Sequence, residues 1–185
     1  MSNALNLSLG AEYNVQSNNI SEFTFIDSTY TSYFTSGNIG KANLFNTYLN
    51  IYFRPSSLFD INLTPQYLYS DFSSNNNGIV SMSKGSGFQL SGQCNVYLPK
   101  KFKLSLNGFM ATNMIWAQGN SNFMGMINGS IGKTFLNGKL NVDLSCQDIL
   151  NSNIWTGNQY SGNVTSVGRW KPETRIAWLN MSYNF

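Results

Sequence analysis

Apolar and polar residues alternate with a period of two along most of the chain. Near the start of the sequence one parity carries apolar residues and the other carries polar ones. The apolar set is Leu5, Leu7, Leu9, Ala11, Tyr13 and Val15, and the polar set is Asn6, Ser8, Gly10, Glu12 and Asn14. This alternation is typical of a β-strand with one apolar face. The opening of the chain is therefore predicted to be a long amphipathic strand.

Eight further segments repeat this pattern, and turn-forming residues separate them. They are expected at residues 21–34, 42–54, 59–69, 88–98, 102–114, 123–135, 140–146 and 177–185. The Asn137-Gly138 pair between two of them is a strong hairpin signal. The pattern predicts an all-β chain of about nine antiparallel strands.

The lengths of the segments and of their connections indicate a membrane protein. Most segments are longer than the roughly 9–11 residues that a tilted strand needs to cross a bilayer. Connections near residues 16–20, 55–58, 99–101 and 136–139 are short, and those near 35–41, 70–86, 116–121 and 150–172 are longer. Outer-membrane barrels show the same asymmetry, with short periplasmic turns and long extracellular loops. We therefore expect an antiparallel up-and-down transmembrane β-barrel.

The strand count bears on whether this barrel is complete. Single-chain bacterial barrels have an even number of strands and periplasmic termini. A count of nine, with Phe185 at the periplasmic side, would start the first strand outside the cell. The sequence therefore predicts that residues 1–185 form one segment of a larger outer-membrane barrel, including its C-terminal strand.

Composition agrees with a barrel and argues against catalysis. Only 10% of residues are charged and the mean hydropathy is −0.21, whereas soluble domains average about 25% charged residues. Histidine is absent and there are two cysteines, which removes most catalytic dyads and the usual zinc sites. We expect no enzyme activity, no metal and no cofactor. The net charge of +3 is small, so nucleic-acid binding is not expected.

Individual residues add detail to the predicted wall. Cys94 and Cys146 lie on the apolar parity, where we expect them to act as small apolar fillers. Aromatic residues near strand ends are expected to form interfacial girdles; these are Tyr13, Phe53, Phe59, Tyr97, Phe102, Trp116, Phe135 and Tyr183. Four residues of the last long loop are a candidate ligand site, where a sugar could stack on the aromatic rings: Trp155, Tyr160, Arg169 and Trp170.

The last seven residues, LNMSYNF, resemble the C-terminal assembly signal of outer-membrane proteins. That signal is a terminal aromatic residue preceded by alternating apolar residues, here Leu179, Met181, Tyr183 and Phe185. Segments at 38–42 (NIGKA), 52–55 (YFRP), 98–102 (LPKKF), 133–140 (KTFLNGKL) and 148–151 (DILN) are similar to the C-terminal barrel of TonB-dependent receptors.

The resemblance implies a location, a function and partners. It implies the outer membrane of a Gram-negative bacterium, with membrane lipid and the barrel-assembly machinery as partners. It also implies nutrient uptake through a 22-stranded barrel that holds an N-terminal plug and engages an energy-coupling protein. The sequence departs from that pattern, because it contains no plug, no energy-coupling box and fewer than half of the strands.

Two alternatives remain open on the sequence. The first is a self-contained small outer-membrane barrel of eight or ten strands, serving as a pore, an adhesin or a structural protein. The second is a soluble β-sandwich that binds carbohydrate, against which stand the terminal aromatic strand and the apolar parity of almost every segment. The transported substrate does not follow from the sequence.

Overall fold

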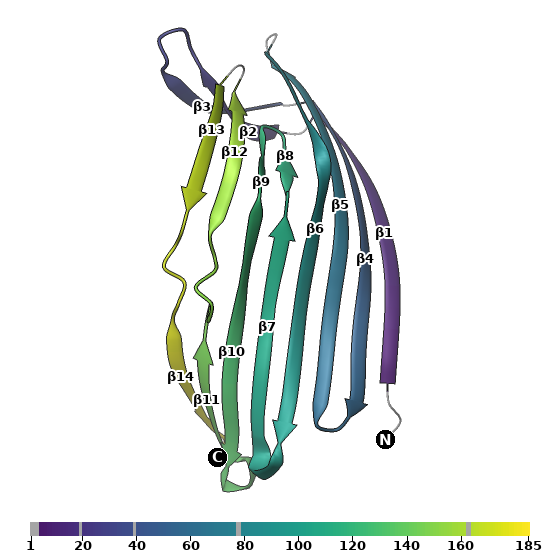
Figure 1. Cartoon of the computed structure of the whole chain (residues 1–185), viewed down its shortest axis with the longest axis vertical. Helices are drawn as coiled ribbons and strands as arrows, with labels where there is room; N and C mark the ends of the chain where they lie inside the picture. Colours follow the sequence, from purple (N-terminus) through teal and green to yellow (C-terminus); the bar gives the residue numbers. More distant parts are fainter. Residues whose placement is uncertain (1–3, 19, 39, 77–78, 162–163) are drawn as a thin grey trace.

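Eight strands form one antiparallel sheet in the computed structural model, which describes residues 4–18, 20–38, 40–76, 79–161 and 164–185. Their order across the sheet is β1-β4-β5-β6-β7-β10-β11-β14 (Figure 1). The bounds are β1 (Ala4–Ser17), β4 (Lys41–Ser56), β5 (Phe59–Asn76), β6 (Ile79–Leu98), β7 (Phe102–Thr112), β10 (Phe123–Phe135), β11 (Leu140–Cys146) and β14 (Ala177–Tyr183). The prediction of an all-β antiparallel architecture is confirmed.

Four shorter strands extend this sheet at one end. They are β8 (Ile115–Trp116), β9 (Gly119–Ser121), β12 (Trp155–Ser161) and β13 (Val164–Trp170), which pair in the order β13-β12-β9-β8. Figure 1 shows each of them continuing a longer strand: β8 continues β7, β9 leads into β10, β12 continues β11, and β13 leads into β14. Within the described residues the chain therefore runs along the length of the sheet eight times.

The two ends of the sheet differ in their connections. At one end, called the tight-turn end, the chain reverses through the 3-10 turns η1 (Pro99–Lys101) and η2 (Leu136–Gly138) and through residues 57–58. Asn137 and Gly138 have φ angles of 55° and 104° there, as the Asn-Gly signal predicts. At the other end, called the loop end, two residues separate β5 from β6, β8 from β9 and β12 from β13, whereas residues 18–40 lie between β1 and β4. Figure 1 shows that β1 begins and β14 finishes at the tight-turn end, on opposite edges of the sheet.

The strand predicted at residues 21–34 is wrong. These residues belong to a separate hairpin of β2 (Ile20–Ile26) and β3 (Ser32–Asn38), which lies at the loop end outside the main sheet. A turn at residues 27–31 interrupts the alternation and reverses the chain. Among the described residues the main sheet thus has eight strands rather than nine, and β1 starts at the end where β14 finishes. The odd-count argument for a larger barrel therefore fails.

Two predicted loops are also strands. Residues 70–86 extend β5 and β6, with Ser70 opposite Gly85 and Asp71 opposite Lys84. Residues 151–172 contain the hairpin of β12 and β13, with Trp155 opposite Trp170. Serine, asparagine and glycine dominate both stretches, so the alternation of apolar and polar residues that predicts a strand is missing. The strands still form, because the hydrogen bonds between them join backbone groups and do not require apolar side chains.

The outermost strands, β1 and β14, form no ladder with each other in the described part of the chain. Each is paired on one side only, β1 with β4 and β14 with β11. The sheet is therefore an open wall with two free edges and is not a closed barrel.

Candidate functional site: the membrane wall and its mouth

One face of the main sheet is a continuous apolar surface. The registers place apolar residues side by side across several strands, as in the row Ile131, Leu144 and Leu179 on β10, β11 and β14. A second row joins Leu7, Ile51 and Leu63 on β1, β4 and β5. Many of these side chains are exposed, and Leu9 is 77% exposed. An exposed apolar surface of this extent is expected to contact lipid or another protein.

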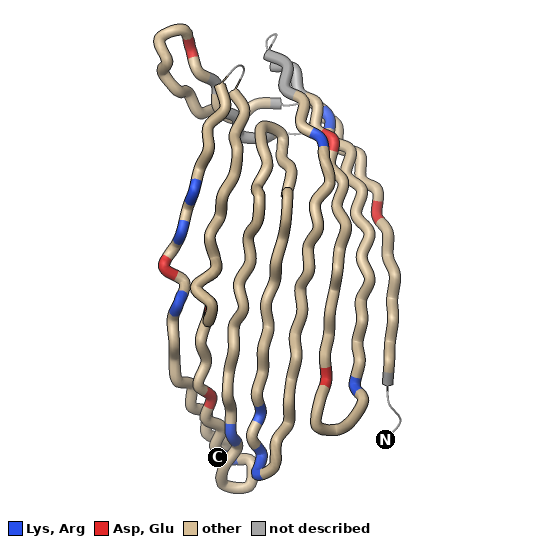
Figure 2. The backbone as a smooth tube through the Cα atoms, viewed as in Figure 1, with Lys and Arg blue, Asp and Glu red and all other residues tan. Residues whose placement is uncertain are grey.

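Charged residues avoid the middle of strands β4 to β10. Figure 2 shows them gathered towards the two ends of strands β4 to β10. The 29 residues from 104 to 132, which form most of β7 to β10, contain no charged residue. Residues 85–98 of β6 contain none either. Within the strands Glu12, Asp60 and Asp143 lie on the polar parity, as predicted, because each pairs in register with polar-face neighbours. A charge facing hydrocarbon would cost about 2–4 kcal/mol at mid-depth.

The opposite face carries a network of hydrogen bonds between polar side chains. Asn95 is buried, donates to Asp60 Oδ1 at 2.7 Å and accepts from Ser105 Oγ at 2.7 Å. Further along, Thr64 donates to Asn50 at 3.0 Å. A hollow of ≈ 430 Å³ opens on this face between β5 and β10. Its polar lining residues are Asn62, Thr64, Ser91, Gln93, Asn107 and Asn128. This face has the chemistry of a water-filled lumen.

The cysteines and most of the girdle residues lie where the sequence predicts. Cys94 and Cys146 are free, half-buried and on the apolar face, opposite Leu106 and Ala177 respectively. The prediction for Tyr97 is wrong. Tyr97 is opposite Lys103 on the polar parity, and Lys103 Nζ lies 5.7 Å from the centroid of its ring.

At the loop end the hairpin of β2 and β3 is fastened to distant strands through Thr24. The amide of Gln118 pairs with both backbone groups of Thr24: Thr24 N donates to Oε1 at 2.9 Å, and Nε2 donates to the Thr24 carbonyl at 3.2 Å. Gln159 Nε2 donates to Thr24 Oγ1 at 2.9 Å, and Ser161 Oγ donates to the Thr24 carbonyl. The hairpin connects β1 and β4 at one edge, so it reaches across the loop end to β12 near the other edge (Figure 1).

The candidate ligand residues do not form one cluster. Trp155 and Trp170 face each other across β12 and β13 and share one side, and Trp155 stacks on Trp116 with ring centroids 5.8 Å apart. Arg169 pairs with Thr156 and Tyr160 with Thr165, so their side chains lie on the opposite side of the hairpin. The four residues therefore serve two different surfaces.

The register identifies these two surfaces. Gly119 and Ser121 share the face of Phe123, because residues two apart on a strand point to the same side. Trp116 pairs with Gly119 and Gly157 pairs with Ser121, so Trp116 and Trp155 lie on the apolar face as well. Tyr160 donates to Asn120 Oδ1 at 3.0 Å on the polar side. The tryptophans are placed as an interfacial belt, and Tyr160 joins an amide cluster that lines the mouth.

That amide cluster is a site which sequence reasoning missed. Asn120 accepts hydrogen bonds from Tyr160 and from Asn158 Nδ2 at 3.3 Å, and it donates to Asn113 Oδ1 at 3.2 Å. Asn113 donates in turn to the carbonyl of Ser86 at 2.7 Å. Such a surface presents neutral donors and acceptors to a ligand in the mouth. No spacing in the sequence brings these residues together, because they come from three strands, β6, β9 and β12, and from the connection between β7 and β8.

The comparisons with known proteins identify the family. The model of the outer membrane protein beta-barrel family matches residues 1–183. The chain belongs to this family. No curated protein and no solved structure matches it. Membership of the outer membrane protein beta-barrel family places the chain in the outer membrane of a Gram-negative bacterium, and the apolar face is its lipid-facing surface.

Membership also separates the alternatives. A soluble β-sandwich is wrong, because the main sheet is a single layer whose apolar face is not covered by a second sheet among the described strands. In the described part of the chain no helix is long and apolar enough to span a bilayer. No cluster of potential metal ligands occurs among those residues either.

The C-terminal strand presents the features of the expected assembly signal. Leu179, Met181 and Tyr183 lie on the apolar face of β14, opposite Leu144, Val142 and Leu140. The Phe185 ring packs edge-on against Tyr183, with centroids 5.2 Å apart. The outer edge of β14 is unpaired, so another strand has access to it.

Proposed function

We propose that this chain forms part of the wall of a larger TonB-dependent receptor-like transporter for nutrient uptake. The two free edges carry this proposal. The backbone N–H and C=O groups along β1 and β14 have no partner strand on one side, and lipid cannot satisfy such groups. Additional strands on both sides would pair them and close a wider barrel.

The polar face supports a transport role within that barrel. The polar face is lined by amides that form hydrogen bonds with neighbouring side chains, namely Asn50, Asn95, Asn107 and Asn128. A lining made mostly of amide side chains binds neutral or zwitterionic solutes weakly enough to release them. In this proposal the chain acts as a wall and loop scaffold and is not an enzyme.

The proposal includes the partners that the family resemblance implies. Outer-membrane lipid covers the apolar face, and the barrel-assembly machinery engages the free edge of β14 during insertion. The remaining barrel strands, a plug and an energy-coupling protein would complete the transporter. No feature of the described surface favours nucleic acid.

A second candidate is a self-contained eight-stranded barrel that acts as a pore, an adhesin or a structural protein. The even number of strands in the described main sheet favours it, because complete single-chain barrels have even strand numbers. Closure would require β1 and β14 to pair with each other, and these two strands run in opposite directions, as such a ladder needs.

Heat-modifiability separates the two candidates. Residues 1–185 are refolded in detergent micelles and run on a gel with and without boiling. The proposed wall segment should show no boiling-dependent shift and should stay protease-sensitive, because its edges lack partners. A clear shift with protease resistance would show a closed small barrel and would reject the larger transporter.

A further inference from the structure

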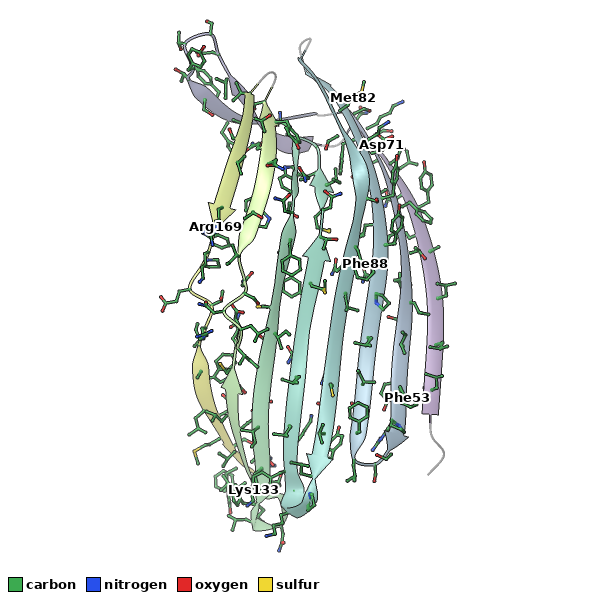
Figure 3. All side chains as sticks on the ribbon, viewed as in Figure 1. Phe53, Asp71, Met82, Phe88, Lys133 and Arg169 are labelled. Atoms are coloured by element: carbon green, nitrogen blue, oxygen red, sulfur yellow. The ribbon has the colours of Figure 1, made fainter. Side chains whose placement is uncertain are left out.

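Lys133 is a cation on the lipid-facing side of the wall. It lies near the tight-turn end of β10 (Figure 3), where it pairs with Phe102 of β7 and Val142 of β11 on the apolar parity. Its Nζ lies 4.4 Å from the centroid of the Phe102 ring and 4.7 Å from that of the Phe135 ring. The two rings hold the ammonium group at the apolar surface through cation–π contacts.

The surroundings of Lys133 leave its charge available to an anion. Asp143 pairs with Gly132 and thus points to the polar face, where its carboxylate accepts from Ser145 Oγ at 2.8 Å. Among the described residues no carboxylate forms an ion pair with Lys133. Further lysines line the same end, namely Lys100, Lys101 and Lys139, and residues 133–142 contain no acidic residue. This rim of the wall is therefore positively charged (Figure 2).

An apolar groove lies on the same face, between Lys133 and the middle of the wall, and Ile131 separates it from Lys133. It begins as a hollow of ≈ 270 Å³ lined mainly by Cys94, Val96, Leu104, Leu106 and Gly129. Cys94 and Leu106 also line a second hollow of ≈ 280 Å³. Gly92 and Gly108 face each other across β6 and β7 and have no side chains to fill this second hollow.

The length of the groove matches one lipid leaflet. Leu104 and Met110 mark its two ends on β7, and six residues of strand span roughly 20 Å. At a strand tilt of about 40° this becomes about 15 Å along the membrane normal, which is half of the roughly 30 Å hydrocarbon core. A single acyl chain can therefore lie in the groove while its headgroup stays at the rim.

We propose that Lys133 and this groove bind an anionic phospholipid of the leaflet at the tight-turn end, which is the periplasmic leaflet because the short turns of outer-membrane barrels face the periplasm. Lys133 Nζ pairs with the phosphate, the neighbouring lysines add long-range attraction, and one acyl chain occupies the groove between β6 and β10. The positive rim selects an anionic lipid over a zwitterionic one, because a net negative headgroup is attracted to clustered lysines near the membrane surface. The site does not depend on how the barrel closes.

Native mass spectrometry of the intact protein, purified in mild detergent, tests this site with phosphatidylglycerol and phosphatidylcholine as probes. The wild-type protein should bind phosphatidylglycerol more tightly. Lys133→Gln should weaken phosphatidylglycerol binding about fivefold, with little change for phosphatidylcholine. Lys133→Arg should retain binding. Cys94→Phe, which fills the groove at its centre, should weaken both lipids.

The matched control is Lys84→Gln. Lys84 lies on the apolar parity at the loop end, opposite Asp71, so its loss should leave phosphatidylglycerol binding unchanged. Equal binding of both lipids by the wild-type protein, or full binding by Lys133→Gln, would overturn the proposal. Rising salt concentration should shrink the wild-type preference for phosphatidylglycerol, and a preference that salt does not change would also overturn it.

Discussion

The Thr174 hydroxyl donates a 2.5 Å hydrogen bond to Asp148 Oδ2. This contact joins two non-strand segments, residues 147–154 and 171–176, that interrupt neighbouring passages of the chain. The same carboxylate accepts from the backbone N–H of Ser152 at 2.8 Å and of Asn153 at 3.1 Å, and Asp148 has no exposed surface. The Asp148 carboxylate thus fixes these two non-strand segments beside each other within the membrane wall.

Replacing Asp148 with alanine should destabilise this region. The substitution leaves the N–H groups of Ser152 and Asn153 without acceptors in a buried site, and each such loss costs about 1–3 kcal/mol. We expect the free energy of unfolding in urea to fall by at least that amount for Asp148→Ala. Asp143→Ala is the control, because the Asp143 carboxylate accepts from Ser145 alone among the described side chains. Equal effects of both variants would contradict this role.

The assignment of faces predicts opposite outcomes at two adjacent positions of β5. Leu63 lies on the apolar face opposite Ile51, and Asn62 lies on the polar face opposite Tyr52. Leu63→Lys should lower stability in lipid by about 2–4 kcal/mol, since it exposes a charge to hydrocarbon. Asn62→Lys should cost far less, because its ammonium faces water. Urea unfolding in vesicles measures the stability of both variants. A larger loss of stability for Asn62→Lys would show that Asn62, and not Leu63, faces the lipid.

Gln118 should control the position of the hairpin of β2 and β3. Gln118→Ala removes both hydrogen bonds of its amide to Thr24. At about 1 kcal/mol each, their loss should raise the detached fraction of the hairpin roughly 30-fold. Limited proteolysis in intact cells reports detachment as faster cleavage within the hairpin. Gln89→Ala is the control, because Gln89 of β6 forms no hydrogen bond with the described part of the hairpin. If Gln118→Ala is cleaved at the wild-type rate, Gln118 does not hold the hairpin in place.

The turn of the same hairpin should depend on pH. The Thr29 hydroxyl and then the Thr31 N–H donate hydrogen bonds to the Asp27 carboxylate and hold its pKa below the usual 3.8. Because the folded-state pKa is depressed, the carboxylate stabilises the turn above pH 3.8, and this contribution is lost as the pH falls through the folded-state pKa.

Carboxyl NMR of Asp27 measures this shift directly. Thr29→Ala should raise the pKa of Asp27 towards 3.8, because it removes the largest cause of the depression. Thr35→Ala, in β3 beyond the turn, should leave the titration unchanged. A pKa of Asp27 at or above 3.8 in the wild-type protein would contradict the hydrogen-bonded turn.

Sequence reasoning succeeded where lipid dictates the residues. Leu140, Val142 and Leu144 alternate with Asn141 and Asp143 because one side of β11 faces hydrocarbon and the other faces polar side chains, so the face of each residue follows from its parity. The same rule placed both cysteines and the C-terminal strand correctly.

Sequence reasoning failed beyond the membrane and where tertiary contacts decide. At the loop end both faces of a strand meet polar surroundings, so β12 and β13 show no apolar alternation. Residues 21–34 were predicted as one strand because Phe23, Phe25 and Tyr33 share a parity although a turn separates them. The hydrogen bonds between Gln118 and Thr24 join residues 94 positions apart, and the hydrogen bond between Thr174 and Asp148 joins residues 26 positions apart. No local pattern predicts such contacts.

The central claim is that β1 and β14 are edges that pair with strands other than each other. Cysteine pairs are introduced into the full-length protein in its native outer membrane, with Cys94 and Cys146 replaced by serine. Leu5, Leu7 and Leu9 of β1 are combined with Ala177, Leu179 and Met181 of β14, and a short bismaleimide is added. The positive control is Leu144→Cys with Leu179→Cys, which lie opposite each other in the ladder of β11 and β14.

We predict that the control pair cross-links and that none of the nine combinations of β1 with β14 does. Cross-linking of any of these combinations as efficiently as the control would show that β1 and β14 close on each other, and would establish the small eight-stranded barrel instead.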